Sequence, residues 1–146
     1  MIVLFDTNVV LDVLMDRQPH SQSAAELMAL VERQKLSGVL GATTVTTIHY
    51  LAYKSVGAAG AARHIRKLLS IFDVAPVTWE TLSDALNLNF PDFEDAVLHE
   101  AARRTGVSGI VTRDPKGFSK AVLRVYSPSE LLKTFENAEI PGETTK

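Results

Sequence analysis

Short apolar runs and longer amphipathic stretches alternate along this chain. Five apolar runs have the length of a β-strand, and they cover residues 2–5, 38–42, 72–77, 109–112 and 122–125. Between them, apolar residues recur every three or four positions, which predicts α-helices over residues 7–14, 21–34, 43–54, 61–70, 78–88, 92–106 and 127–135. Strands that alternate with helices are typical of a parallel sheet covered by helices on both faces. The pattern therefore predicts an α/β fold.

The composition fits one globular domain. With 146 residues, 46% of them hydrophobic, the chain can bury one sizeable core but not two. We expect the domain to cover residues 1–136 and the polar residues 137–146 to form a flexible C-terminal tail. No apolar run approaches the ~20 residues of a membrane span, and the N-terminus lacks the pattern of a signal peptide. A cytoplasmic protein with no membrane association is therefore expected.

Charge and residue types exclude several kinds of site. Seventeen acidic residues against fifteen Lys and Arg give a net charge of −2, so any nucleic acid has to be held by a local basic patch. The chain has no cysteine, which excludes disulfides, thiolate metal ligands and thiol nucleophiles. Its four histidines show no metal-ligand spacing, and we interpret them as surface or hydrogen-bonded structural residues.

Aspartates follow two of the predicted strands and begin one of the predicted helices. Asp6 comes directly after the first strand, and Asp114 lies two residues past the strand that ends at Thr112. Asp92 and Asp95 are three residues apart, which places both carboxylates on one face of a first helical turn. Ligands of open α/β sheets bind at the carboxyl ends of the strands. We therefore expect these acids to share one site.

Clustered carboxylates without basic partners favour a metal site. Neighbouring carboxylates raise each other's pKa, and a bound divalent cation removes that cost. An all-oxygen ligand set favours Mg²⁺ or Mn²⁺ over zinc, and such ions commonly serve phosphoryl chemistry. One or two ions can orient a water for attack on a phosphodiester. The predicted chemistry is metal-dependent phosphodiester hydrolysis.

Each of these acids also has a purely structural interpretation. Asp6 can cap the first helix, and Asp92 with Asp95 resembles a capping box. Asp114 before a proline is a common turn residue. Three acidic positions that such a fold brings together are hard to explain as three independent caps. Their joint placement therefore favours the metal site.

Two segments of the sequence resemble the PIN domain, in particular the VapC-type toxin nucleases. The opening IVLFDTNVVLDVL resembles that family's first strand and Asp-Thr-Asn motif, and FPDFEDAVLHEAARRTGVSGIVTRDPKGF resembles its later signature. The resemblance extends over about residues 2–129. It implies a three-layer α/β/α fold around a five-stranded parallel sheet, dependence on Mg²⁺ or Mn²⁺, and endoribonuclease activity.

The resemblance also implies roles for individual residues. Asp6, Asp95 and Asp114 would be catalytic acids that bind the metal, and Asp92 would be a neighbouring catalytic acid. Asn8 and Thr112 would sit at the rim as polar contacts to metal-bound water or phosphate. Apart from the resemblance, the hydroxyl of Thr47 could hold a coordinated water, and Arg113 and Lys116, which flank Asp114, could contact the substrate phosphate. The implied partners are RNA, an antitoxin protein if the chain is the toxin of such a pair, and a second copy in a homodimer.

The chain departs from the family pattern at two positions. Relatives usually place a Glu in the helix after the second strand, where this chain has Thr47, and often an Asp at the position of Gly117. A missing carboxylate weakens the metal site. The alternative to a nuclease is therefore a non-catalytic PIN-like module that binds RNA or protein.

Basic and aromatic residues suggest where RNA would bind. Residues 54–72 carry four bases and no acid, while residues 103–124 carry six bases against one acid. Arg113 and Lys116 flank a proposed site acid and are the favoured phosphate contacts. Tyr50 and Tyr53 lie at helical spacing and are interpreted as core residues, with a substrate groove as the alternative.

Overall fold

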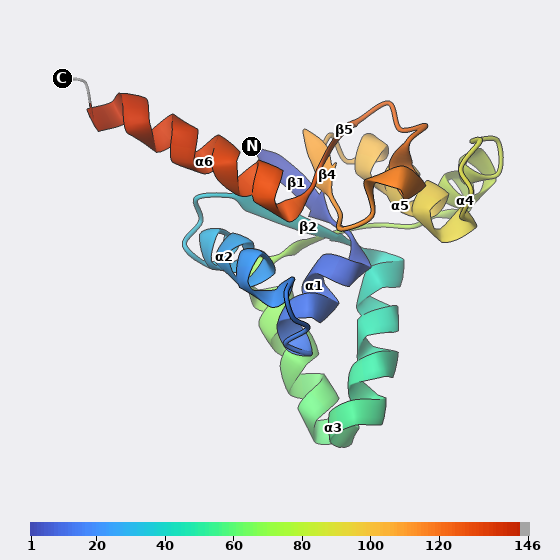
Figure 1. Cartoon of the computed structure of the whole chain (residues 1–146). Helices are drawn as coiled ribbons and strands as arrows, with labels where there is room; N and C mark the ends of the chain where they lie inside the picture. The colour runs from blue at the N-terminus through green and yellow to red at the C-terminus, as the bar shows by residue number, and fades with distance from the viewer. Residues whose placement is uncertain (144–146) are drawn as a thin grey trace.

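A five-stranded sheet in which all neighbours are parallel forms the centre of the molecule (Figure 1). The computed structural model describes the backbone of residues 1–143 and the side chains of residues 1–137. The strand order is β3-β2-β1-β4-β5. The strands are β1 (Ile2–Phe5), β2 (Ser37–Gly41), β3 (Asp73–Ala75), β4 (Gly109–Val111) and β5 (Arg124–Tyr126). The order changes direction at β1, so the carboxyl ends of β1 and β4 lie side by side, where such sheets bind ligands.

Helices cover both faces of this sheet, which confirms the expected three layers. The helices are α1 (Thr7–Leu14), α2 (Ser21–Glu32), α3 (Ala42–Ile71), α4 (Trp79–Ala85), α5 (Phe93–Arg104) and α6 (Pro128–Glu143). Val3 and Phe5 of β1 pack into a core shared with α1, α2 and α3, whereas Leu4 packs into a second core with α5. This alternation follows from the two-residue period of a strand.

The predicted elements match the observed ones with two differences. The sequence predicts separate helices over 43–54 and 61–70, but they join into α3, which bends at Gly57. Gly57 has φ 79° and ψ 179°, a conformation that favours glycine, and the two arms of α3 fold around α1 (Figure 1). Helix α6 continues through Glu143, so residues 137–143 of the expected tail are helical, and residues 144–146 lie outside the described residues. The division at residue 136 stays a prediction.

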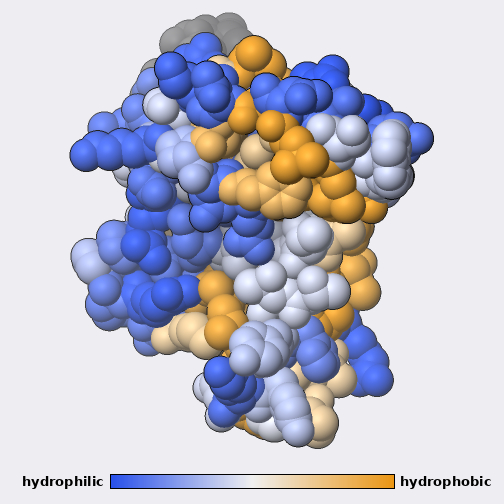
Figure 2. Space-filling view, turned by 90° about the vertical axis from the view of Figure 1, so that its right-hand side faces the viewer, coloured by the Kyte–Doolittle hydropathy of each residue, from blue (hydrophilic) through white to orange (hydrophobic). Residues whose placement is uncertain are grey.

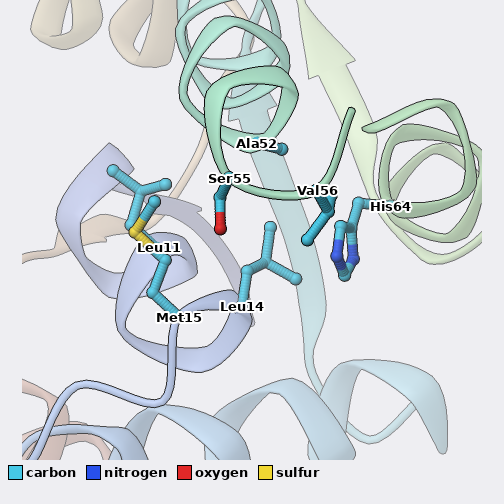
Figure 3. A pocket seen from close by; sticks show the side chains of 7 residues that line it. All are labelled: Leu11, Leu14, Met15, Ala52, Ser55, Val56 and His64. Atoms are coloured by element: carbon cyan, nitrogen blue, oxygen red, sulfur yellow. The ribbon is translucent and has the colours of Figure 1, made fainter. Parts of the chain in front are cut away.

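The surface carries a small pocket and an apolar patch, both formed by helices. The pocket lies between α1 and the two arms of α3, and no carboxylate lines it (Figure 3). Exposed hydrophobic residues gather in a patch over α4 and the start of α5, in the upper part of the view in Figure 2; they are Trp79, Leu82, Leu86 and Phe93. Among the described residues, no helix is both long and apolar enough to cross a membrane.

Candidate active site

Asp6 joins the end of β1 to the start of α1. One carboxylate oxygen accepts a hydrogen bond from the backbone N–H of Thr7 (2.7 Å), so Asp6 caps the helix. Its other oxygen accepts a hydrogen bond from the hydroxyl of Thr112 (2.7 Å). Asp6 is only 7% exposed. The capping role and the site role are therefore compatible, since each uses a different oxygen.

Thr112 couples the two central strands at their carboxyl ends. Its hydroxyl donates to Asp6 and accepts from the backbone N–H of Asp114 (3.0 Å). The family resemblance implies a place for Thr112 at the rim of the site, but the side chain is completely buried. Its observed contacts position the two acids, and substrate contact by Thr112 stays a prediction.

Asp95 and Asp114 converge on Gly117. A Cβ atom built on Gly117 would lie 2.8 Å from Asp95 Oδ2 and 3.4 Å from Asp114 Oδ2. Asp114 begins the short 3-10 helix Pro115–Phe118, but its side chain makes no capping hydrogen bond. Its carboxylate is therefore available to the site. The glycine, which departs from the family pattern, lets both carboxylates come close to the backbone at a position where a larger side chain would collide with Asp95.

Two further acids stand at the start of α5. Asp92 is exposed and accepts a hydrogen bond from the backbone N–H of Asp95 (3.2 Å), so it caps α5, as the structural interpretation expects. Glu94, which belongs to none of the predicted site positions, is close enough to raise the pKa of both Asp6 and Asp95. The signal that could have found it is local charge density, since three of the four residues 92–95 are acidic.

Burial and mutual repulsion disfavour the charged form of these carboxylates. Burial, followed by the negative charges of Asp6, Asp92, Glu94 and Asp114, raises the pKa of Asp95 to about 7. Burial also raises the pKa of Asp6, although the hydrogen bonds from Thr112 and Thr7 act in the opposite direction and lower it. Every charged group that shifts either pKa is an acid. The site therefore carries negative charge, and among the described residues no basic side chain contributes to the pKa shifts of Asp6 and Asp95.

The donor set fits a divalent cation that keeps part of its water shell. Within the described part of the chain, no three acidic or imidazole side chains are close enough to enclose an ion alone. Mg²⁺ needs only one or two carboxylates and retains several waters, and Mn²⁺ accepts similar oxygen ligands. The residues that would hold the ion are Asp95 and Asp114, whose carboxylates lie close to Gly117, and Asp6, whose charge acts on Asp95.

Arg113 is engaged in a buried ion pair that the sequence did not predict. Its guanidinium donates to both carboxylate oxygens of Asp12 (2.7 and 3.2 Å), and Arg17 lies 3.3 Å from the same carboxylate. Asp12 is 1% exposed. The backbone N–H of Arg113 also donates to the side-chain oxygen of Asn8 (3.2 Å). Asn8 and Arg113, which were both predicted to contact substrate, thus have partners within the protein, and these contacts fix the loop that leads to Asp114.

Two further predicted substrate contacts, Lys116 and Thr47, lie on different elements and differ in exposure. Lys116 is exposed beside Asp114 on the 3-10 helix, where it can reach a phosphate. Thr47 is half-buried on α3, a helix that contains no acidic residue at all. The contact between α3 and the Asp6 region is made instead by Thr44, whose hydroxyl lies 2.9 Å from that of Thr7. Substrate binding by Thr47 and Lys116 stays a prediction.

The buried histidine has a structural role, as expected. His99 Nε2 accepts a hydrogen bond from the backbone N–H of Val122 (3.1 Å), so the proton resides on Nδ1, which faces Glu100 (3.3 Å). Burial lowers the pKa of His99, and Glu100 is in turn bound by Arg103. His99 is therefore a neutral, hydrogen-bonded core residue.

Gly117→Ala is expected to weaken metal binding without unfolding the protein. The new methyl group pushes the Asp95 carboxylate aside, and such displacement of a ligand typically costs about tenfold or more in metal affinity. Stability is expected to change little, because the clash falls on the end of a side chain. Calorimetric titration with Mn²⁺ and thermal unfolding without metal measure the two effects. Unchanged Mn²⁺ affinity would place the ion elsewhere.

Comparisons with known proteins agree on one family. The profile of the PIN domain family matches residues 2–116. Among solved structures, VapBC2 from Rickettsia felis, bound to a DNA fragment from its promoter, is similar with a TM-score of 0.67 at 15% identity, covering 87% of this chain and 98% of that one. FitAcB from Neisseria gonorrhoeae has a TM-score of 0.66 at 17% identity, with coverage of 87% and 98%.

A third similar structure is a toxin. VapC20 from Mycobacterium tuberculosis, described as a toxin that cleaves the sarcin-ricin loop, has a TM-score of 0.59 at 16% identity and covers 74% of this chain and 86% of its own. None of the curated proteins compared with the chain matches it. The profile match covers most of the chain, and the structural similarity agrees with the observed fold. The chain belongs to the PIN domain family.

Proposed function

We propose that this protein is a Mg²⁺- or Mn²⁺-dependent endoribonuclease that hydrolyses RNA phosphodiester bonds. The observation that carries the proposal is the approach of the Asp95 and Asp114 carboxylates to the same residue, Gly117, with the charge of Asp6 close enough to act on Asp95. Burial, together with the neighbouring acids, raises the pKa of Asp95 to about 7, and in the described part of the chain no basic group is among the causes of this shift, which is the electrostatic setting that a divalent cation relieves. Family membership supports the nuclease class.

The residues of the site have separate tasks in this reaction. A divalent cation bound there supplies a Lewis acid and lowers the pKa of a bound water. Asp95 and Asp114 would bind the cation. Thr112 fixes the position of the Asp6 carboxylate relative to the backbone of Asp114 through its two hydrogen bonds. Glu94 adds the negative charge that α3 does not supply, because Thr47 stands where relatives carry a Glu. Lys116 contacts the substrate phosphate.

We infer that the biological role is that of a toxin with a protein antitoxin. Several similar structures are complexes of this kind, including a toxin-antitoxin complex from Klebsiella pneumoniae at 19% identity. Action in the cytoplasm and homodimerisation belong to the same proposal.

The activity is tested by cleavage of RNA with and without metal. Wild-type protein and Asp6→Asn are incubated with single-stranded and structured RNAs in Mn²⁺, in Mg²⁺ and in EDTA. Cleavage by the wild type that requires the metal and is lost in Asp6→Asn supports the proposal. Asp73→Asn, which changes an exposed carboxylate on β3, is the matched control and should cleave normally.

The second candidate is a PIN domain that binds RNA or protein without cleaving. It is favoured by a single observation, the absence of any acid on α3. If the wild type leaves all RNAs intact in Mn²⁺ and matches Asp6→Asn, the nuclease proposal is abandoned in favour of this one.

A further inference from the structure

The first arm of α3 presents a largely exposed strip of hydroxyl, aromatic and basic side chains. We call it the α3 strip, and it consists of Thr46, Thr47, Tyr50, Tyr53 and Lys54. These residues are spaced by three, four and seven positions and therefore share one face of the helix. The opposite face of the same arm is buried, with Thr44, Ile48 and Ala52 in the protein interior. The strip is thus the solvent side of an amphipathic helix.

The aromatic rings of the strip are open to solvent, contrary to the expected core role. Tyr50 is 59% exposed and Tyr53 is 53% exposed. The ammonium group of Lys54 lies 4.8 Å from the centre of the Tyr50 ring, a cation–π contact. His49 approaches Tyr53 with 6.5 Å between ring centres. Rings that hold a cation beside an open face resemble the surfaces on which nucleic-acid bases stack.

Helix α3, whose solvent side carries the strip, begins near the proposed catalytic carboxylates. The hydroxyl of Thr44, in the first turn of α3, lies 2.9 Å from that of Thr7, which directly follows Asp6. From Thr44 to Lys54 the helix rises about 15 Å, at ~1.5 Å per residue. A strand of RNA with its scissile phosphate at the carboxylates can therefore continue along this arm for several nucleotides.

Charge also favours the strip as an RNA track. The site acids repel phosphates, so the substrate needs attraction from a neighbouring surface. Helix α3 contains four Lys and Arg residues and no acid, and of these only Lys67 pairs with an acid, Glu32, in the described part of the chain. The remaining three extend positive charge from the strip into the second arm. A phosphate backbone meets no like charge along this helix.

A protein partner fits the strip less well than RNA does. The exposed apolar residues that a protein interface needs gather on the patch over α4, in the upper part of Figure 2. The first arm of α3 lies in the lower part of that view, where weakly and strongly hydrophilic residues prevail. The two surfaces therefore differ in the chemistry of the partner they suit.

We propose that the α3 strip binds single-stranded RNA, with unpaired bases stacked on Tyr50 and Tyr53 and a phosphate held by Lys54. The inference rests on the proposed RNA substrate and names its class. Stacking on an open ring requires a base that is free of its pairing partner, so a continuous duplex cannot use the strip.

The test measures binding in EDTA, so its readout does not depend on catalysis. A fluorescent single-stranded RNA of about 12 nucleotides, a length that matches the site sizes of such grooves, is titrated with each protein, following fluorescence anisotropy. The proteins are the wild type, Tyr50→Ala/Tyr53→Ala and Tyr50→Phe/Tyr53→Phe. The alanine variant is expected to raise the Kd about tenfold or more, while the phenylalanine variant keeps wild-type affinity because it keeps the rings. Lys54→Gln should lower the slope of log Kd against log salt by about one.

Matched controls show whether the effect is specific to the strip. Trp79→Ala, which removes an exposed ring from the patch over α4, should leave RNA affinity unchanged. The proposal is overturned if Tyr50→Ala/Tyr53→Ala binds the RNA as tightly as the wild type does. It is also overturned if this variant loses self-association while its affinity for RNA stays the same. Equal affinity of the wild type for a duplex of the same sequence overturns it too. If the strip binds RNA as expected but Mn²⁺ produces no cleavage, only the proposed nuclease activity fails.

Discussion

Replacing Asp95 by asparagine is expected to abolish metal-dependent cleavage and, in the same molecule, to raise the stability of the metal-free protein. Activity falls because the variant loses a carboxylate that holds the cation, and a loss of about 100-fold or more is expected. Stability rises because the folded protein no longer has to keep a half-buried carboxylate among four other acids. Solvent screens part of this repulsion. The gain is therefore about 1 kcal/mol, or a Tm about 3 °C higher.

The pH dependence of stability provides a sharper measurement of the same effect. Folding raises the pKa of the Asp95 carboxyl from its ordinary value of 3.8 to about 7, so the folded protein binds the proton more tightly than the unfolded chain does. This contribution to stability is complete below about pH 4, is lost as the pH rises towards about 7, and stays absent above it. In Asp95→Asn this carboxyl group is absent, so the variant does not lose stability in this way as the pH rises. Urea unfolding in EDTA at about pH 4, 6 and 8 should show the two proteins diverging as the pH rises.

Metal should reverse this order of stability. Mn²⁺ binds the folded wild type and is expected to raise its Tm at about pH 8, with a smaller effect at about pH 5, where protons compete for the carboxylates. Asp95→Asn should show little stabilisation by Mn²⁺ at either pH. A metal-free variant less stable than the wild type at the higher pH would contradict the electrostatic account, and Asp73→Asn is the matched carboxylate control.

Arg113→Ala is expected to lower the free energy of unfolding by about 3 kcal/mol, because it leaves a buried carboxylate without its main partner. Asp12 is 1% exposed, and Arg113 supplies two of its hydrogen bonds, while Arg17 provides a single contact at 3.3 Å. The ion pair also fixes the residue that precedes Asp114. Loss of activity in this variant therefore accompanies loss of stability.

Comparison with Lys116→Ala separates structure from substrate binding. Lys116 is exposed and adjoins the same site acid, so its loss should raise KM for RNA with little change in urea unfolding. Arg113→Lys is informative as well, since a lysine cannot reproduce the paired hydrogen bonds to Asp12 and should recover stability only partly. If Arg113→Ala raises KM and leaves unfolding unchanged, its side chain contacts phosphate after all.

Local sequence patterns were sufficient for the fold class and for most of the elements. The continuous apolar run of β1, which is buried on both faces, and the three- and four-residue spacing in α1 and α5 follow from which faces are buried, so they can be recognised from the chain alone. The placement of Asp6 and Asp114 after strands predicted their common edge for the same reason. Gly57 marked the bend of α3.

Tertiary contacts decided what each polar side chain does. Arg113 and Thr112 have the residue types of substrate contacts, but Asp12 and Asp6, about a hundred positions earlier in the sequence, accept their hydrogen bonds. Tyr50 and Tyr53 are spaced like core residues, yet they lie on the solvent side of α3 because Ile48 and Ala52 occupy its buried face.

The sequence by itself determined that acids follow the ends of strands in a parallel sheet, because local patterning marks where each strand ends. Only the tertiary structure decided the strand order that brings these strand ends together, the approach of Asp95 and Asp114 to Gly117, and the burial that raises the pKa of Asp95 to about 7. The physical reason is that a pKa and a close contact depend on which groups surround a carboxylate in three dimensions, and two of the four acids that act on Asp95, namely Asp6 and Asp114, are distant from it along the chain.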